Sequence, residues 1–226
     1  MVETHTAHPK ALDVAVPGVE LILGGQKSGK SRRAECLANA WLAGAPVNGQ
    51  PRQATLIATA QPWDAEMQRC IARHQADRAQ RAPGLATLEE PVALAQAISR
   101  LSAPHHLLVV DCLTLWLTNL LMPLEDAPGA AQGDATVVSG HRAENIDKNS
   151  LPSLSGIGSV TMFLESLKAV SGPVVLVGNE LGLGVIPMGE QVRHFVSTTG
   201  QLNQAVAALS QRVVLMVAGL PMVVKA

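Results

Sequence analysis

Short apolar runs alternate along this chain with stretches in which apolar residues recur at helical spacing. The apolar runs predict strands at residues 20–23, 54–60, 107–111, 174–178 and 213–217. The last four runs are continuously apolar, as expected of strands that are covered on both faces. The helical spacing predicts helices at residues 31–42, 64–81, 91–101, 114–122, 159–170 and 190–209. This alternation predicts an α/β fold in which helices flank a mostly parallel central sheet.

Two stretches lack this rhythm. Residues 1–17 show no apolar periodicity, and we expect a flexible N-terminal tail there. Residues at about 125–157 are rich in Gly, Ser, Ala, Pro and Asp, and we expect a polar, mobile surface insertion. The 226-residue chain is 47% hydrophobic, which is enough to bury one sizeable core. We therefore predict a single domain over residues 18–226.

The most specific motif follows the first predicted strand, where residues 24–31 read GGQKSGKS. This is the pattern of a phosphate-binding loop, in which glycines allow a tight turn that points successive N–H groups at phosphate oxygens. An ordinary glycine-rich turn is the alternative, but the strand before it and the helix after it favour a nucleotide site. The predicted contacts are Gly24, Gly25, Gln26, Lys27, Ser28, Gly29, Lys30 and Ser31. The fold is accordingly predicted to be that of a P-loop NTPase.

Asp111 closes the predicted strand 107–111. In a phosphate-loop protein a carboxylate at this position holds Mg²⁺ directly or through water, and the hydroxyl of Ser31 is the second predicted ligand. An acidic residue after an apolar strand is also a common way to begin a loop, so the phosphate loop is what favours the metal site. Glu180, which closes the next apolar strand, is a further candidate for the same cleft.

His74 lies on the predicted helix 64–81, where it shares a face with Met67, Ile71 and Arg78. The spacing by itself favours a histidine at the margin of a buried stripe. A neutral imidazole can also attack phosphorus, and Arg78 one turn later could neutralise the developing charge. The residues alone leave both interpretations open.

Composition and charge exclude several classes of partner. The formal net charge is −1 and the isoelectric point is near 6.6, so no basic field favours nucleic acid or an anionic membrane. No run approaches the roughly 20 apolar residues of a membrane span and no secretion signal is visible, so we expect a cytoplasmic protein. The three cysteines, Cys36, Cys70 and Cys112, fit neither a disulfide framework nor a zinc site, and we expect reduced, buried thiols.

Several further stretches follow one another in the order and spacing of a single enzyme family. They are residues 23–32, 57–61, 64–67, 87–91, 110–121, 179–187, 193–195, 200–204 and 219–221, together with His74 and Arg78. Through them the chain resembles the bifunctional adenosylcobinamide kinase/adenosylcobinamide-phosphate guanylyltransferases of adenosylcobalamin biosynthesis. The resemblance extends from about residue 20 to the C-terminus, apart from the insertion.

The resemblance implies two successive reactions. ATP or GTP phosphorylates the hydroxyl of the aminopropanol side chain of adenosylcobinamide. GMP then passes from GTP to that phosphate, which gives adenosylcobinamide-GDP and pyrophosphate. In the family a histidine on the helix after the second strand carries the GMP, and His74 occupies that position.

The family's other nucleotide contacts map onto Thr59, Ala60, Gln61, Gln75, Ala76, Asp77, Arg78, Glu89 and Asp111. Glu89 is a candidate acceptor for the guanine edge. The resemblance thus implies GTP, ATP and Mg²⁺ as ligands, a corrinoid substrate and a homo-oligomer, for which the family suggests a trimer. Three positions depart from the family pattern: Ala79 and Leu85 stand where Pro and Trp are usual, and Ser197 stands where an acidic residue is usual.

Two other functions remain compatible with the phosphate loop. One is a kinase of another small alcohol or nucleoside, which would need no covalent intermediate. The other is a nucleotide-dependent regulatory binding module, in which the loop orders a mobile segment instead of transferring phosphate.

Overall fold

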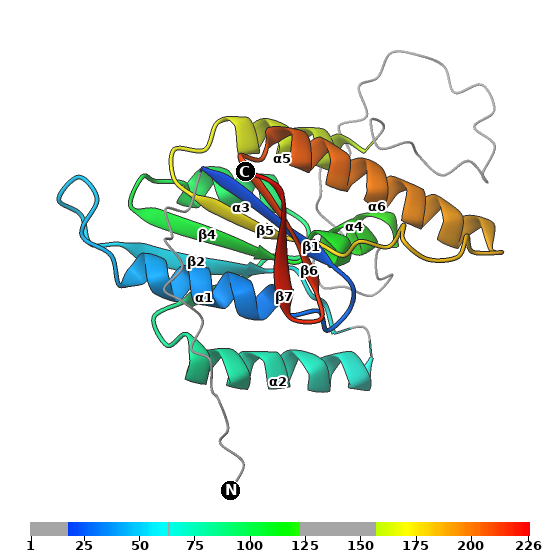
Figure 1. Ribbon diagram of the computed structural model, residues 1–226, viewed down its shortest axis with the longest axis horizontal. Coiled ribbons are helices and arrows are strands. Elements are labelled where there is room, and N and C mark those ends of the chain that lie inside the picture. The colour runs from blue at the N-terminus through cyan, green and yellow to red at the C-terminus, as the bar shows by residue number, and fades with distance from the viewer. Residues whose placement is uncertain (1–17, 63, 123–156) are drawn as a thin grey trace, which may run out of the picture.

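The computed structural model describes residues 18–62, 64–122 and 157–226, so the predicted tail and nearly all of the predicted insertion lie outside the described residues. In the described part, a seven-stranded sheet has the order β3-β2-β4-β5-β1-β6-β7 (Figure 1). Its strands are β1 Val19–Gly24, β2 Gln53–Ala58, β3 Ala86–Glu89, β4 His106–Asp111, β5 Val174–Val177, β6 Arg212–Val217 and β7 Leu220–Lys225. All neighbouring strands are parallel except β6 and β7. The predicted α/β fold with a mostly parallel central sheet is confirmed.

Helices cover both faces of this sheet. The described helices are α1 Lys30–Leu42, α2 Ala65–Arg81, α3 Leu94–Leu101, α4 Leu113–Leu121, α5 Gly158–Lys168 and α6 Glu190–Leu209. Along β4, Leu107 and Val109 pack with α1 in one apolar cluster, whereas Leu108 and Val110 pack with α3, α4, α5 and α6 in another. Successive residues of a strand point to opposite faces, so these central strands must be apolar throughout.

The predicted elements all correspond to observed ones, with ends that differ by at most three residues. Strands β3 and β7 were not predicted. Strand β3 has only four residues, three of them exposed, and every residue of β7 is exposed. Neither strand therefore shows the burial pattern that identifies the others. Pro221 in β7 is compatible with an edge strand, where no ladder hydrogen bond is required on the free side.

The prediction of buried thiols is wrong for Cys36, which is exposed, and right for Cys112, which is buried. Cys36 shares the outer face of α1 with the exposed residues Arg32 and Ala40, because four residues make about one helical turn. The Cys70 side chain lies outside the described part of the chain. None of the described helices is both long and apolar enough to cross a membrane.

Candidate active site

The phosphate loop turns directly after β1, at the carboxyl end of the sheet. Gly24 has a φ of 151° and Gly29 a φ of 98°, which are conformations that favour glycine. A Cβ atom at Gly24 would lie 2.6 Å from the Met216 carbonyl oxygen and 2.7 Å from Ser28 Oγ. The loop is thus closed against β6, and only glycine fits at its first position.

Helix α1 begins at Lys30 without a side-chain cap at its N-terminus. Its first N–H groups are therefore available to an anion, which the helix dipole also favours. The Lys30 ammonium donates to the carbonyl oxygens of Gly24 at 3.1 Å and Gly25 at 2.6 Å. Burial lowers the pKa of Lys30, and the neighbouring Cys112 and Asp111 oppose this shift. The loop brings N–H groups and a cation to one place, as a nucleotide phosphate chain requires.

Asp111 lies beside this loop, where its carboxylate and the Ser31 hydroxyl are hydrogen-bonded. Burial raises the pKa of Asp111. The Ser31 hydrogen bond opposes that rise, as do the neighbouring side chains of His74, Arg78 and Lys30. A carboxylate and a hydroxyl held together suit Mg²⁺, which takes few protein ligands and keeps waters or phosphate oxygens at its other positions.

Helix α2 carries the predicted nucleophile. Asp64 caps its N-terminus by accepting a hydrogen bond from Met67 N at 2.7 Å. His74 is exposed, whereas Arg78 on the next turn is buried, which does not fit the solvated arginine expected beside a buried stripe. In Figure 1 this helix lies on the same side of the sheet as α1 and beyond it.

One cavity of about 670 Å³ lies between the phosphate loop and α2. The predicted site residues that line it are Gln26, Lys27, Ser28, Gly29, Lys30, Ser31, Ala60, His74, Gln75, Asp77, Arg78, Glu89 and Asp111. Five others do not line it, namely Gly24, Gly25, Thr59, Gln61 and Ala76. The structure thus brings the predicted nucleophile, the loop lysine and the predicted metal ligands to a single cavity.

A second cavity of about 440 Å³ adjoins the first and shares Gln75, Arg78 and Glu89 with it. Much of its remaining wall is apolar and includes Ala79 and Leu85, two of the positions that depart from the family pattern. Gln75 Nε2 donates to Glu89 Oε1 at 3.0 Å. A carboxylate is therefore held where the phosphate cavity meets a smaller cavity with apolar walls.

Helix α4 connects three of the loops at this edge of the sheet. The Thr59 hydroxyl accepts from Cys112 N at 2.9 Å and donates to Cys112 O at 2.7 Å. Asn119 Nδ2 donates to Thr59 O at 2.7 Å and to Pro91 O at 3.0 Å. Thr59 is fully buried, so its side chain holds the loops after β2 and β4 together instead of facing the cavity.

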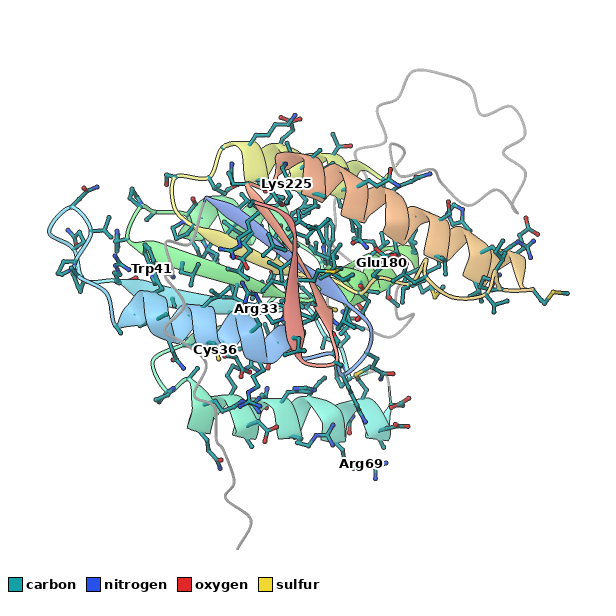
Figure 2. All side chains as sticks on the ribbon, in the orientation of Figure 1. Arg33, Cys36, Trp41, Arg69, Glu180 and Lys225 are labelled. Atoms are coloured by element: carbon teal, nitrogen blue, oxygen red, sulfur yellow. The ribbon has the colours of Figure 1, made fainter. Side chains whose placement is uncertain are left out.

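Asn179 lines the cavity, although the sequence drew attention to its neighbour Glu180. Glu180 Oε1 accepts from Gly182 N at 3.0 Å, and its Oε2 accepts from Asn203 Nδ2 at 3.4 Å. Figure 2 labels Glu180 where the chain has left β5. Neighbouring residues of an extended segment point in opposite directions, so a shift of one position changes which side chain faces the cavity.

Residues 20–224 match the family described as cobinamide kinase / cobinamide phosphate guanyltransferase. The bifunctional adenosylcobalamin biosynthesis protein CobP of Pseudomonas aeruginosa is 42% identical over 206 residues, which cover 91% of this chain and 96% of that protein. The bifunctional adenosylcobalamin biosynthesis protein CobU of Escherichia coli is 30% identical over 205 residues, which cover 91% of this chain and 98% of that protein. Among solved structures, the flagellar accessory protein FlaH of Methanocaldococcus jannaschii has a TM-score of 0.43 at 10% identity, over 92% of this chain and 78% of that chain.

Proposed function

Because this chain belongs to the cobinamide kinase / cobinamide phosphate guanyltransferase family, we propose that the cavity between the phosphate loop and α2 serves both of its reactions. The protein is a bifunctional enzyme that phosphorylates adenosylcobinamide and transfers GMP from GTP to adenosylcobinamide phosphate. Family membership removes the alternatives of a kinase for another alcohol and of a regulatory module. The proposal of a shared cavity rests on one observation, which is that Lys30, His74 and Asp111 line the same space.

In the kinase reaction the phosphate loop holds the β and γ phosphates of ATP or GTP. The substrate hydroxyl attacks the γ phosphorus, the bond to the β–γ bridging oxygen breaks, and the nucleoside diphosphate leaves. The hydroxyl proton passes to an oxygen of the transferred phosphate and from there to water. Lys30 and the first N–H groups of α1 stabilise the negative charge on the phosphate oxygens. This reaction needs positioning and charge, but no protein nucleophile.

In the guanylyl transfer we assign the nucleophile to His74. The lone pair of a ring nitrogen attacks the α phosphorus of GTP, the bond to the α–β bridging oxygen breaks, and pyrophosphate leaves. A phosphate oxygen of adenosylcobinamide phosphate then attacks the same phosphorus, and the pair of the N–P bond returns to the imidazole. Arg78, which lines both cavities, neutralises charge on the α phosphate.

We assign Mg²⁺ to Ser31 and Asp111, because the structure holds a hydroxyl and a carboxylate in contact beside the phosphate loop. Bound there, Mg²⁺ would neutralise charge on the phosphates in both reactions. The protein's own part is to keep Asp111 in place at the end of β4, where it is half-buried and lines the cavity.

We assign guanine selection to Glu89. Its carboxylate can accept hydrogen bonds from the N1–H and the exocyclic amino group of guanine, which adenine does not present in the same arrangement. Gln75 Nε2 donates to the Glu89 carboxylate at 3.0 Å, and Ala79 and Leu85 provide an apolar wall for a planar base.

The family resemblance also leads us to propose a cytoplasmic homo-oligomer.

The shared cavity is tested by Lys30→Ala. We expect both cobinamide phosphorylation and GMP transfer to fall at least about 100-fold, because one set of donors stabilises phosphate charge in both. Lys168→Ala is the matched control, since this exposed lysine on α5 forms an ion pair with the exposed Glu165, and it should leave both rates unchanged. A Lys30→Ala protein that kept either rate would show that the two reactions use different sites.

A further inference from the structure

The substrate's macrocycle needs a surface outside the nucleotide cavity. A corrin ring with its peripheral amides cannot share about 670 Å³ with a nucleotide, and only its side chain has to reach the phosphorus. The rest of the corrinoid must therefore lie on the rim. The edge of the corrin ring carries methyl groups as well as amides. A surface that binds this edge should therefore present exposed apolar side chains from an ordered segment.

Residues 181–188, here called the rim segment, have this character. Leu183 is 80% exposed, Val185 95%, Ile186 78% and Met188 95%. Single exposed apolar side chains are ordinary on protein surfaces, but a run of them on one short segment marks a surface that contacts something.

The rim segment adjoins the cavity. It begins two positions after Asn179, a cavity residue whose N–H donates to Thr114 Oγ1 at 2.8 Å. Asn203 Nδ2 donates to Asn179 O at 3.0 Å. Figure 1 shows the chain leaving the carboxyl end of β5, which is the end of the sheet that carries the phosphate loop. The start of the rim segment is thus held close to a residue that lines the cavity.

Polar contacts hold the backbone of the rim segment. Gly182 N donates to Glu180 Oε1 at 3.0 Å near its start. Near its end, Arg193 Nη1 donates to Pro187 O at 3.2 Å and also to Met188 O. The apolar side chains are therefore presented to solvent from a segment that is held at both ends, which lowers the entropy cost of binding a rigid partner.

We propose that the rim segment binds the apolar edge of the corrin macrocycle and directs its side-chain hydroxyl or phosphate past Asn179 into the cavity. The identity of this ligand rests on the function given above. A second copy of the chain is the competing occupant, and the direct continuation of the rim segment into a cavity residue favours the substrate.

The test is a double substitution, Val185→Ser with Met188→Ser, in the full chain. We expect its affinity for adenosylcobinamide, measured by equilibrium dialysis, to fall at least about tenfold. Each apolar group that is removed reduces the apolar surface buried on binding, and with it the favourable binding free energy. Met162→Ser is the matched control, because Met162 is an exposed methionine on α5, and it should bind as the unmodified protein does. Labelling by GTP that is radioactive at the α phosphate should not change, because it needs no corrinoid.

Unchanged corrinoid affinity in the double variant would overturn the proposal. A loss of affinity accompanied by a lower molar mass in light scattering would also overturn it, by assigning the rim segment to contacts between copies. Leu183→Ser, measured in the same way, gives the answer should the double variant fail to fold. If the unmodified protein failed to take the GMP label, only the role of His74 would be contradicted. The proposal for the rim segment would stand, because corrinoid binding is measured in a separate experiment.

Discussion

The role that we propose for Asp111 requires its charged form, which burial disfavours. Burial raises its pKa, because the charged form is disfavoured away from water. A carboxyl whose pKa is raised by folding stabilises the fold fully below its unfolded pKa, and this contribution is lost as the pH rises through the folded pKa. The nucleotide-free protein should therefore lose stability at this residue as the pH rises above the ordinary carboxyl range.

Asp111→Asn removes this ionisation while it keeps the shape of the side chain. We expect the variant to melt at a higher temperature than the unmodified protein, and the difference to be larger at pH 8 than at pH 5. Turnover in both reactions should fall roughly 100-fold, with a higher Mg²⁺ requirement, because the charge that we propose binds the metal is lost. Thermal melts at the two pH values and a magnesium titration measure these effects. A magnesium titration identical to that of the unmodified protein would remove Asp111 from the metal site.

The residues of the site differ in how far the sequence specifies them. The phosphate loop is a local motif, and Asp111 closes an apolar strand, so the sequence could predict that residues 26–31 and Asp111 lie at one site, and all of them line the cavity. The direction in which a single side chain points is harder to predict from the sequence. Thr59 was a predicted nucleotide contact, yet its hydroxyl bonds to Cys112, and this partner is brought close only when β2 and β4 pair.

At the scale of elements, α4 matters most to the geometry of the site. Asn119 on this helix joins the loops after β2 and β3, and Thr114 accepts from the loop after β5. Trp116 Nε1 adds a hydrogen bond to Val92 O at 2.9 Å. Because these bonds are buried or partly buried, water replaces them poorly when one partner is removed.

Asn119→Ala should cost about 1–3 kcal/mol of unfolding free energy, because two backbone carbonyl oxygens lose their donor in a buried place. The KM for GTP should rise as well, since the loops that flank the cavity lose their common anchor. Asn39→Ala is the control, because Asn39 Nδ2 makes an exposed bond to Arg81 O that water can replace. Urea unfolding and initial rates measure both effects. Equal losses in the two variants would contradict a special role for Asn119.

The elements themselves were largely predictable because the central strands are buried on both faces and the helices are amphipathic. The two edge strands, β3 and β7, were not, since edge residues are exposed and lack the pattern that burial imposes. Strand order was not predictable either. It places β5 between β4 and β1, and that arrangement depends on contacts between residues far apart in the chain.

At the scale of the whole molecule, parallel strands bring the ends of β1 and β4 to one edge, and α2 places His74 across a cavity from them. The same nucleotide phosphates can therefore face either a substrate hydroxyl or a histidine. The kinase reaction needs no protein nucleophile, whereas transfer of GMP through the enzyme does. The two reactions should respond differently to the loss of one imidazole.

The most direct measurement compares the two rates in His74→Asn, which keeps hydrogen-bonding capacity without imidazole nucleophilicity. We expect the protein to lose the acid-labile GMP label and the formation of adenosylcobinamide-GDP, while it keeps its melting temperature and most of its phosphorylation of adenosylcobinamide. His105→Asn, just before β4 at the opposite edge of the sheet, should behave like the unmodified protein. GMP labelling that continues in the folded His74→Asn protein would contradict the central claim that His74 carries the guanylyl group.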